Sequence, residues 1–441
     1  MVNMLKSTVV TGCAMFLVLM TSAVRSATPA LAQSTVVVGT GNPEVDVPAV
    51  QAAIDHGGEV VLKGHFSFDR SPTMPTAFGE LATIRVWQAV EIAGARAEGA
   101  GMTTIEGGTI PFYVEAPGVS VTIQHLRFIR PARAGIQVSA VNGLRIFSCR
   151  FEGTVPVPGT GATSAISIVT TLQLPTPAQP GHAENLSGRM TIADNDIDAV
   201  GGTERDNKLG ITIFSAGQTA ENEVDIYVTG NHIRNVTEPA INLRRIGGRA
   251  HVEGNVIATG PVSSQSTVRP EAIRVVNTGS YVIAHNSIKY QWPDPDGMGI
   301  GVFSQFAQWP MEHAVVLDNE VTMLPPEDTV FGTFSTGIDI RGFALDNVVA
   351  NNRIRGRARA ALALDVFNGG IPGNNAFMLN RFDHFAAARA DMFVDAGITD
   401  TLILGEKGTV EDHGINTIDI PFYRDHSPSD KPDAEFIRHH R

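Results

Sequence analysis

Two columns of polar side chains in this sequence carry the chemistry needed to bind and process an acidic ligand. Short segments of the form small–apolar–x–apolar recur along the chain, and each column consists of the residues at one equivalent position in successive segments. The charged and amide members are Asn242, Arg244, Arg274, Asp339, Arg341 and Asp365. Guanidinium groups bind carboxylates through paired hydrogen bonds, and two carboxyl groups can divide acid and base roles. The expected catalytic residues are Arg274, Asp339, Arg341 and Asp365, and Asn242 and Arg244 are expected to bind substrate.

Aromatic side chains occur in the same part of the chain. Trp292, Phe303 and Trp309 lie within or between these segments, and aromatic rings bury large apolar areas against a ligand. Together with the arginines they favour a polysaccharide ligand, for example one containing uronates. In a lyase reaction the base is harder to assign, and Asp339 and His313 are the two candidates.

A second interpretation needs no ligand. Arg341 would lie beside Asp365 on the next segment, and Arg274 would lie two segments from Asp339. Opposite charges on neighbouring strands attract each other. The same residues could therefore form a salt-bridged sheet face whose role is structural.

The segments that must position these side chains recur along the chain. The strand-like copies begin at Gly135, Ala165, Gly210, Ala240, Ala272, Gly299, Gly337 and Ala361. Before each copy stands a corner of the form Asn-x-apolar, at Asn195, Asn231, Asn255, Asn286, Asn319, Asn352 and Asn380, with Leu126 and Cys149 as earlier copies that lack Asn. A repeat at such a spacing indicates stacked coils.

The shortest repeats, such as the 24 residues from Asn231 to Asn255, fit three short strands with their turns. Most length variation falls between the corner and the following strand, as expected when insertions occupy one face of a solenoid. Apolar residues alternate within each strand, so the intervening residues point outward. The candidate columns are therefore predicted to share one outer face.

The asparagine column itself is interpreted as structural. Asn tolerates tight-turn dihedrals and hydrogen-bonds the backbone, and stacked amides can pair from coil to coil. Cys149 occupies the same column and is expected to be buried core. It is one of two cysteines, with Cys13, so no internal disulfide is expected once the leader is removed.

The first residues have the layout of a signal peptide. Lys6 precedes an apolar run, and Ala30-Leu-Ala32 matches a small-x-small cleavage pattern. The sequence predicts removal of residues 1–32, a secreted or periplasmic protein, and no membrane association afterwards. A net charge of −12 over 441 residues argues against nucleic acid as a partner.

The predicted domain extends over residues 33–425, with clear repeats at about 119–395 and a polar tail at 426–441. A short amphipathic helix is expected from Pro48 to Asp55, with Asp46 as its N-cap. The strand Glu59–Leu62 follows it directly. Because a solenoid must cover the exposed end of its core, this helix is predicted to be an N-terminal cap.

The Asn corners, the small-Ile-x-Val strands and the helix-then-strand opening resemble the right-handed parallel β-helix proteins of the pectin-lyase-like superfamily. The resemblance implies an all-β, right-handed parallel β-helix solenoid, and a polysaccharide-facing groove along one sheet. The catalytic motifs of its pectate lyases and polygalacturonases are absent, so no catalytic residue is carried over. Fold alone does not fix function.

We therefore expect an exported β-helix protein that binds a polysaccharide, and the sequence leaves open whether the protein also cleaves it as a lyase or a hydrolase. A non-catalytic structural or surface protein of the cell envelope is the alternative. No metal site and no cofactor are expected. Ca²⁺ stays open because Asp and Asn oxygens suit it, although the Asp294–Gly297 segment favours a turn.

Overall fold

The computed structural model describes residues 34–71, 73–77, 79–95, 101–153, 163–170, 185–199, 208–214, 224–260, 271–277, 279–405 and 408–420. The predicted signal peptide, the Pro/Gly-rich insertion at 172–181 and the tail from 426 lie outside these ranges. Within them, no helix is both long and apolar enough to cross a bilayer.

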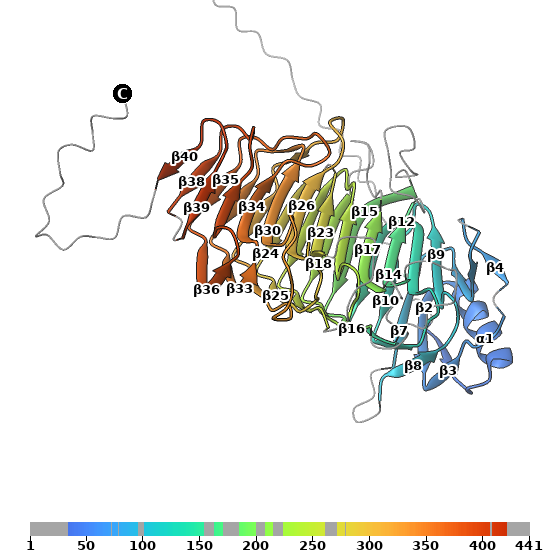
Figure 1. The fold of residues 1–441 in the computed structure, drawn as a ribbon. Coiled ribbons are helices and arrows are strands. Elements are labelled where there is room, and N and C mark those ends of the chain that lie inside the picture. The colour runs from blue at the N-terminus through green and yellow to red at the C-terminus, as the bar shows by residue number, and fades with distance from the viewer. Residues whose placement is uncertain are drawn as a thin grey trace, which may run out of the picture. The chain divides into compact units, whose positions relative to one another are not determined.

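The described chain winds through three ladders of parallel strands (Figure 1). The first ladder comprises β1 (Thr35–Val38), β2 (Gly58–Lys63), β7 (Val90–Gly94), β10 (Val121–Gln124), the second half of β12 (Ala134–Phe147), β15 (Leu186–Ala193), β18 (Val224–Thr229), β21 (Arg249–Glu253), β24 (Ser280–Ala284), β28 (Val315–Leu317), β32 (Val348–Ala350), β35 (Ala376–Met378), β38 (Leu402–Leu404) and β40 (Ile418–Ile420).

The second ladder comprises β3 (His65–Ser67), β8 (Thr103–Glu106), β11 (Leu126–Ile129), β13 (Arg150–Glu152), β16 (Asp196–Asp198), β19 (His232–Arg234), β22 (Val256–Ala258), β25 (Ser287–Tyr290), β29 (Glu320–Met323), β33 (Arg353–Ala358) and β36 (Arg381–Ala387).

The third ladder comprises β6 (Ile84–Val86), β9 (Phe112–Ala116), the first half of β12, β14 (Thr163–Val169), β17 (Lys208–Phe214), β20 (Ile241–Arg244), β23 (Glu271–Val276), β26 (Met298–Ser304), β30 (Thr336–Gly342), β34 (Ala360–Asp365), β37 (Met392–Val394) and β39 (Val410–Asp412). Two small pairs complete the strands, β4 (Met74–Pro75) with β5 (Leu81–Ala82), and β27 (Met311–Glu312) with β31 (Ala344–Leu345).

The core between the ladders consists of stacked aliphatic side chains. Ile300, Ile338 and Leu362 are register partners on β26, β30 and β34, and all three are fully buried. Each coil thus places its apolar residues over those of the next coil, as the period-two alternation predicts. The chain is a parallel β-helix.

The predicted structural role of the asparagine column is confirmed. Asn286 Nδ2 donates to Asn319 Oδ1 at 2.9 Å and to the Val252 carbonyl at 2.8 Å. The same contacts recur from Asn195 to Asn352, with Asn380 as the last acceptor. Cys149 continues the column, because its backbone N–H donates to Asn195 Oδ1. Burial raises the pKa of the Cys149 thiol to about 12, as fits a core residue.

A second, shorter amide column was not predicted. Asn347 Nδ2 donates to Asn375 Oδ1 at 2.9 Å, and the Ala314 N–H donates to Asn347 Oδ1. These residues precede β28, β32 and β35 in the first ladder. This second column spans only three coils, and position 314 is not an Asn. The sequence therefore showed no recurring pattern from which the column could be predicted.

The N-terminal helix begins earlier than expected. Helix α1 runs from Pro43 to His56, and Asn42, not Asp46, is the N-cap. Asp46 is buried and instead accepts hydrogen bonds from the backbone N–H groups of Thr40 and Ser67. Helix α1 packs against β1, β2, β3 and β6. Its role as a cap over the core stays a prediction.

The asparagine column should contribute strongly to stability. Asn286→Ala removes one acceptor and two donated hydrogen bonds, and leaves the buried N–H groups of Asn255 without their acceptor. We expect a loss of about 2–4 kcal/mol in the free energy of unfolding, measured by chemical denaturation. Ser287→Ala, on the exposed neighbouring residue, should change it by less than about 0.5 kcal/mol. Equal stability of the two variants would contradict this role.

Candidate functional site

The third ladder brings the two predicted columns together in the expected register. Asn242 pairs with Arg274, Arg274 with Gly301, and Gly301 with Asp339 on successive strands. In the second column Phe303 pairs with Arg341, and Arg341 with Asp365.

Three of these side chains form a compact group with Glu271, here called the charged cluster: Glu271, Arg274, Asp339 and Arg341. Glu271 Oε1 lies 2.8 Å from Arg341 Nη2, and Asp339 Oδ2 lies 3.3 Å from Arg341 Nη1. Arg274 Nε lies 3.7 Å from Glu271 Oε2. Two guanidinium groups and two carboxyl groups thus lie together on β23 and β30.

Gly301 makes this arrangement possible. It lies between Arg274 and Asp339 in the register, and a Cβ there would stand 2.9 Å from Glu271 Cγ. The glycine therefore leaves a gap through which Glu271 of β23 reaches across β26 to Arg341 of β30. Side-chain size on the middle strand, and not sequence proximity, sets this contact.

A second ion pair lies next to the charged cluster. Asp365 Oδ2 accepts a hydrogen bond from Arg359 Nη2 at 2.6 Å, and both side chains are buried. The predicted ion pair between Arg341 and Asp365 is therefore not formed. Asp365 pairs with Arg359 instead, and Arg341 pairs with Glu271 and Asp339. Arg274 likewise pairs with Glu271 and not with Asp339.

The expectation of an open groove is wrong at the charged cluster. Glu271 and Asp339 are 0% exposed, and Arg341 is 1% exposed. Three aromatic rings surround the Arg341 guanidinium, with centroids 4.3 Å (Phe303), 5.0 Å (Phe367) and 5.1 Å (Phe334) from its carbon. Phe334 lies between β29 and β30, and Phe367 follows β34. Connecting loops thus cover what the alternation predicted to be an outward face.

Several polar atoms in this enclosed group still lack hydrogen bonds. They are Nε and Nη1 of both Arg274 and Arg341, both carboxylate oxygens of Asp339, Oε2 of Glu271 and Nε of Arg359. Some of these atoms make the longer ion pairs above, which fall short of hydrogen-bond geometry. Buried polar atoms are nearly always hydrogen-bonded, so this concentration distinguishes the charged cluster from the rest of the described core.

Burial also shifts protonation. Burial and the nearby Asp365 raise the pKa of the Asp339 carboxyl to about 8, although Arg341 and Arg359 oppose the shift. Burial likewise raises the pKa of Asp365, against the effect of Arg359. Asp339 is therefore largely protonated at neutral pH, and a protonated carboxyl can donate a proton.

The residues expected to bind substrate differ in their positions. Asn242 is buried and accepts a hydrogen bond from Arg244 Nε at 3.2 Å. The partly exposed Arg244 lies over the Phe214 ring, and burial and Arg274 hold the pKa of Arg244 well below its usual range. These two side chains adjoin the charged cluster as predicted.

The predicted aromatic residues do not line an open surface. Trp292 is a core residue: it is fully buried, and its indole N–H donates to the Val236 carbonyl at 3.0 Å. Phe303 lies on the expected face but is buried beneath Arg341. Trp309 is partly exposed and packs on Arg245, away from the two columns. Trp292 therefore lies in the core and does not line an outer face, and its role in substrate binding stays a prediction.

Among the described residues, no three His, Cys, Asp or Glu side chains are grouped as a metal site. The Asp294–Gly297 segment forms a turn, in which Asp294 Oδ1 accepts the Asp296 N–H at 2.8 Å. Asp296 Oδ1 then accepts the backbone N–H of Phe334. This contact ties the turn to the loop that covers Arg341.

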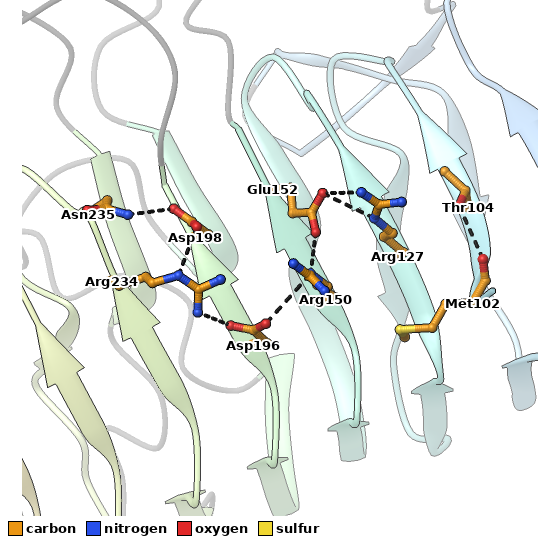
Figure 2. Close-up of polar contacts among 9 residues, drawn as sticks. All are labelled: Met102, Thr104, Arg127, Arg150, Glu152, Asp196, Asp198, Arg234 and Asn235. Atoms are coloured by element: carbon orange, nitrogen blue, oxygen red, sulfur yellow. Dashed lines mark hydrogen bonds and ion pairs between the residues drawn. The ribbon is translucent and has the colours of Figure 1, made fainter.

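The outer face of the second ladder provides a contrast (Figure 2). Oppositely charged side chains pair within and between neighbouring coils: Arg127 pairs with Glu152, Arg150 with Glu152 and Asp196, and Arg234 with Asp196 and Asp198. Many of these side chains are more than one-third exposed. Every side chain of this ion-pair ladder has an oppositely charged neighbour, and most are open to water, so the ladder holds no comparable group of unsatisfied polar atoms that a ligand would pair with.

Sequence reasoning missed four residues of the site: Glu271, Arg359, and Phe334 and Phe367, whose rings cover it. Glu271 begins β23 and occupies the position just before the small residue of its copy. That position is Ala134, Ser164, Leu209, Pro239, Glu271, Met298, Thr336 and Ala360 in successive copies. Glu271 is the one charged residue among these, which was an available signal.

The fold has counterparts among solved structures. PfbA, a surface adhesin of Streptococcus pneumoniae, aligns with a TM-score of 0.50 and 12% identity, over 82% of this chain and 93% of its own. The A-module of the Azotobacter vinelandii mannuronan C-5 epimerase AlgE4 aligns with a TM-score of 0.44 and 13% identity, over 87% and 98%. What is shared is the β-helix fold. No protein-family profile and no curated protein sequence matches the chain.

The raised pKa of Asp339 predicts a pH effect on stability. A carboxyl whose folded-state pKa is raised favours the folded state below its usual pKa of about 4, and this contribution is lost as pH rises towards about 8. Asp339→Asn should therefore become progressively more stable relative to wild type between these values, as measured by urea denaturation. Asp383→Asn, on the partly exposed β36, should show no such trend. A pH-independent difference for Asp339→Asn would contradict a buried, protonated Asp339.

The gap above Gly301 predicts a specific steric effect. Gly301→Ala places a methyl group against Glu271 and should break the Glu271–Arg341 contact, with a loss of about 2–4 kcal/mol in unfolding free energy. Gly101→Ala is the matched control because no atom lies within 4 Å of its added Cβ. If Gly301→Ala unfolds like wild type, Glu271 does not depend on this gap.

Proposed function

We propose that this β-helix binds an acidic polysaccharide at the charged cluster and cleaves it there. The observation that carries the proposal is the set of buried polar atoms without hydrogen bonds on Arg274, Arg341 and Asp339. These guanidinium atoms make no hydrogen bond, although two of them lie in the longer ion pairs described above, and a ligand carboxylate would accept from them. A uronate-containing chain supplies such carboxylates at regular intervals.

The proposed cleavage uses Asp339 as proton donor. Its carboxyl, largely protonated at neutral pH, would give a proton to the glycosidic oxygen as the bond breaks. Asp365 is the second carboxyl. It lies on the neighbouring strand β34, two residues after Ala363, the register partner of Asp339, and would assist the attack of water by accepting its proton. A protonated Asp339 is a poor base, and the other proposed base, His313, is exposed between β27 and β28. Hydrolysis is therefore favoured over elimination.

Access to the site would require movement of the covering loops. Phe334 and Phe367 lie over Arg341, so a polysaccharide must displace these rings to reach the unpaired donors. The positions of Arg244 and Phe214 support entry from that side, because both are partly exposed at the neighbouring strands. We further propose that the protein acts outside the cytoplasm, on the basis of the predicted signal peptide.

The alternative function is structural, and one observation favours it. The short Glu271–Arg341 contact and the three rings around Arg341 make this guanidinium a fixed part of the protein. Buried ion pairs can specify one arrangement of packed elements. In that case the charged cluster would hold neighbouring coils in register and would bind nothing.

Binding assays separate these two functions. Wild-type protein should bind polygalacturonate or alginate but not neutral dextran in calorimetric titrations, with and without chelator. Arg274→Gln should weaken binding about 10- to 100-fold, because a charge-assisted hydrogen bond contributes about 1.5–3 kcal/mol. Arg234→Gln, in the exposed ion-pair ladder, should bind like wild type.

Product analysis then tests cleavage. New reducing ends without unsaturated ends, lost in Asp339→Asn, would support hydrolysis, whereas ultraviolet-absorbing unsaturated ends would indicate a lyase. Absence of binding to every acidic polysaccharide, together with a large stability loss in Arg274→Gln, would assign the charged cluster to the structural role.

A further inference from the structure

A second site candidate lies far along the ladders from the charged cluster, beside helix α1. A cavity of about 380 Å³ lies between α1, β4 and β6, where Gln51, Asp55, Met74, Pro75, Arg85 and Trp87 are among its lining residues. A neighbouring cavity of about 200 Å³ shares Gln51 and Met74 with it. The larger volume falls within the range of about 300–1,000 Å³ typical of small-ligand sites.

Trp87 is exposed in a way that the other tryptophans are not. Its side chain is 48% exposed, whereas Trp292 is fully buried and Trp309 is only partly exposed. A large aromatic ring exposed at the edge of a cavity offers apolar area that a ligand can cover.

The Trp87 ring is held in place by polar contacts. Its indole N–H donates to Asp55 Oδ1 at 2.8 Å, and Gln51 Nε2 donates to the same oxygen at 2.8 Å. Gln51 also bonds both backbone groups of Arg85, through Oε1 at 2.9 Å and Nε2 at 2.9 Å. The Trp87 ring is therefore held in place without a ligand, which lowers the entropic cost of binding.

Hydrogen-bonding groups of both kinds flank the ring. Both bonds to Asp55 end on Oδ1, which leaves Oδ2 of this exposed carboxylate as an acceptor. Arg85 is 48% exposed and pairs with Glu115 through Nη2, which leaves further guanidinium donors beside the ring. Adjacent hydroxyl groups of a sugar donate and accept at once, so they match an acceptor and a donor set around an aromatic face.

We propose that this groove binds a neutral sugar chain, with Trp87 as the stacking platform and Asp55 and Arg85 as hydrogen-bonding partners. The carboxylates of Asp55 and Glu115 disfavour an anionic sugar here. The site is independent of the charged cluster, which would take the acidic chain. A proline-rich peptide also packs on aromatic grooves, but it lacks the donors that would use Asp55 Oδ2.

The test uses full-length protein and hexasaccharides of β-1,4-linked glucose, mannose and N-acetylglucosamine, with a proline-rich decapeptide as a further probe. Calorimetric titration should detect binding of at least one hexasaccharide. Trp87→Ala should weaken it at least tenfold, whereas Trp87→Phe, which keeps a ring but loses the indole N–H, should keep part of the affinity. Asp55→Asn should weaken it as well, with the thermal unfolding midpoint near wild type.

Two controls separate this site from the rest of the molecule. Tyr227→Ala removes an aromatic ring that is stacked on His251 in the first ladder, and it should leave hexasaccharide binding unchanged. Arg274→Gln should also leave it unchanged, so failure of the acidic-polysaccharide proposal would not affect this result. The inference is overturned if no hexasaccharide binds wild type, if Trp87→Ala binds as tightly as wild type, or if only the peptide binds in a Trp87-dependent manner.

Discussion

The structure depends on one constraint, that every coil must stack on its neighbours in register. In a parallel ladder a shift by one residue would move every apolar side chain from the core to the outside. The asparagine column makes such a shift costly, because each amide donates to the amide and the backbone of flanking coils and no substitute partner is available inside. Backbone hydrogen bonds alone would allow neighbouring registers, since they are the same at every position. The side-chain amides are what make one register unique.

That constraint explains why much of the fold was predictable from the sequence. A stack that repeats imposes the same requirement at each corner, so Asn231, Asn255 and Asn286 recur visibly. The alternation that places Arg274 and Asp339 in one column follows from the same requirement, and the observed register confirms it. Prediction failed in segments that do not belong to the repeat, such as the N-terminal helix. The helix start at Pro43 was missed because Asp46 has a tertiary role, as acceptor for Thr40 and Ser67, that resembles a cap in sequence.

The candidate site was only half predictable for a related reason. Alternation tells which side chains leave the core, but it does not tell whether a loop returns to cover them. Phe334 and Phe367 lie in connections without periodicity, and their contact with Arg341 depends on loop paths that no local pattern encodes. Trp292 was assigned to substrate binding because it lies between two of the repeated segments, whereas its indole N–H reaches the Val236 carbonyl inside. Aromatic residues near a predicted groove thus carry little information about exposure.

Burial changes the meaning of the charges that alternation places outside. In the second ladder, water screens Arg150 and its partners, so their ion pairs together contribute little to stability. In the charged cluster the same residue types lack water, and their protonation, hydrogen bonding and packing become interdependent. The pKa of a carboxyl such as Asp339 is then set more by burial and by neighbouring charges than by the ordinary value for an aspartate. The two outer faces share one scaffold and differ mainly in whether loops cover them.

The contact of Glu271 with Arg341 bridges 70 residues of sequence and passes over a whole intervening coil. Solenoids commonly change length by gaining or losing coils, since each one contacts only its neighbours. Between β23 and β30 that freedom is lost. A duplicated or deleted coil there would put a different residue beneath Glu271, or move Arg341 out of its reach. This part of the chain is therefore constrained to keep its number of coils, while the coils on either side remain free to vary.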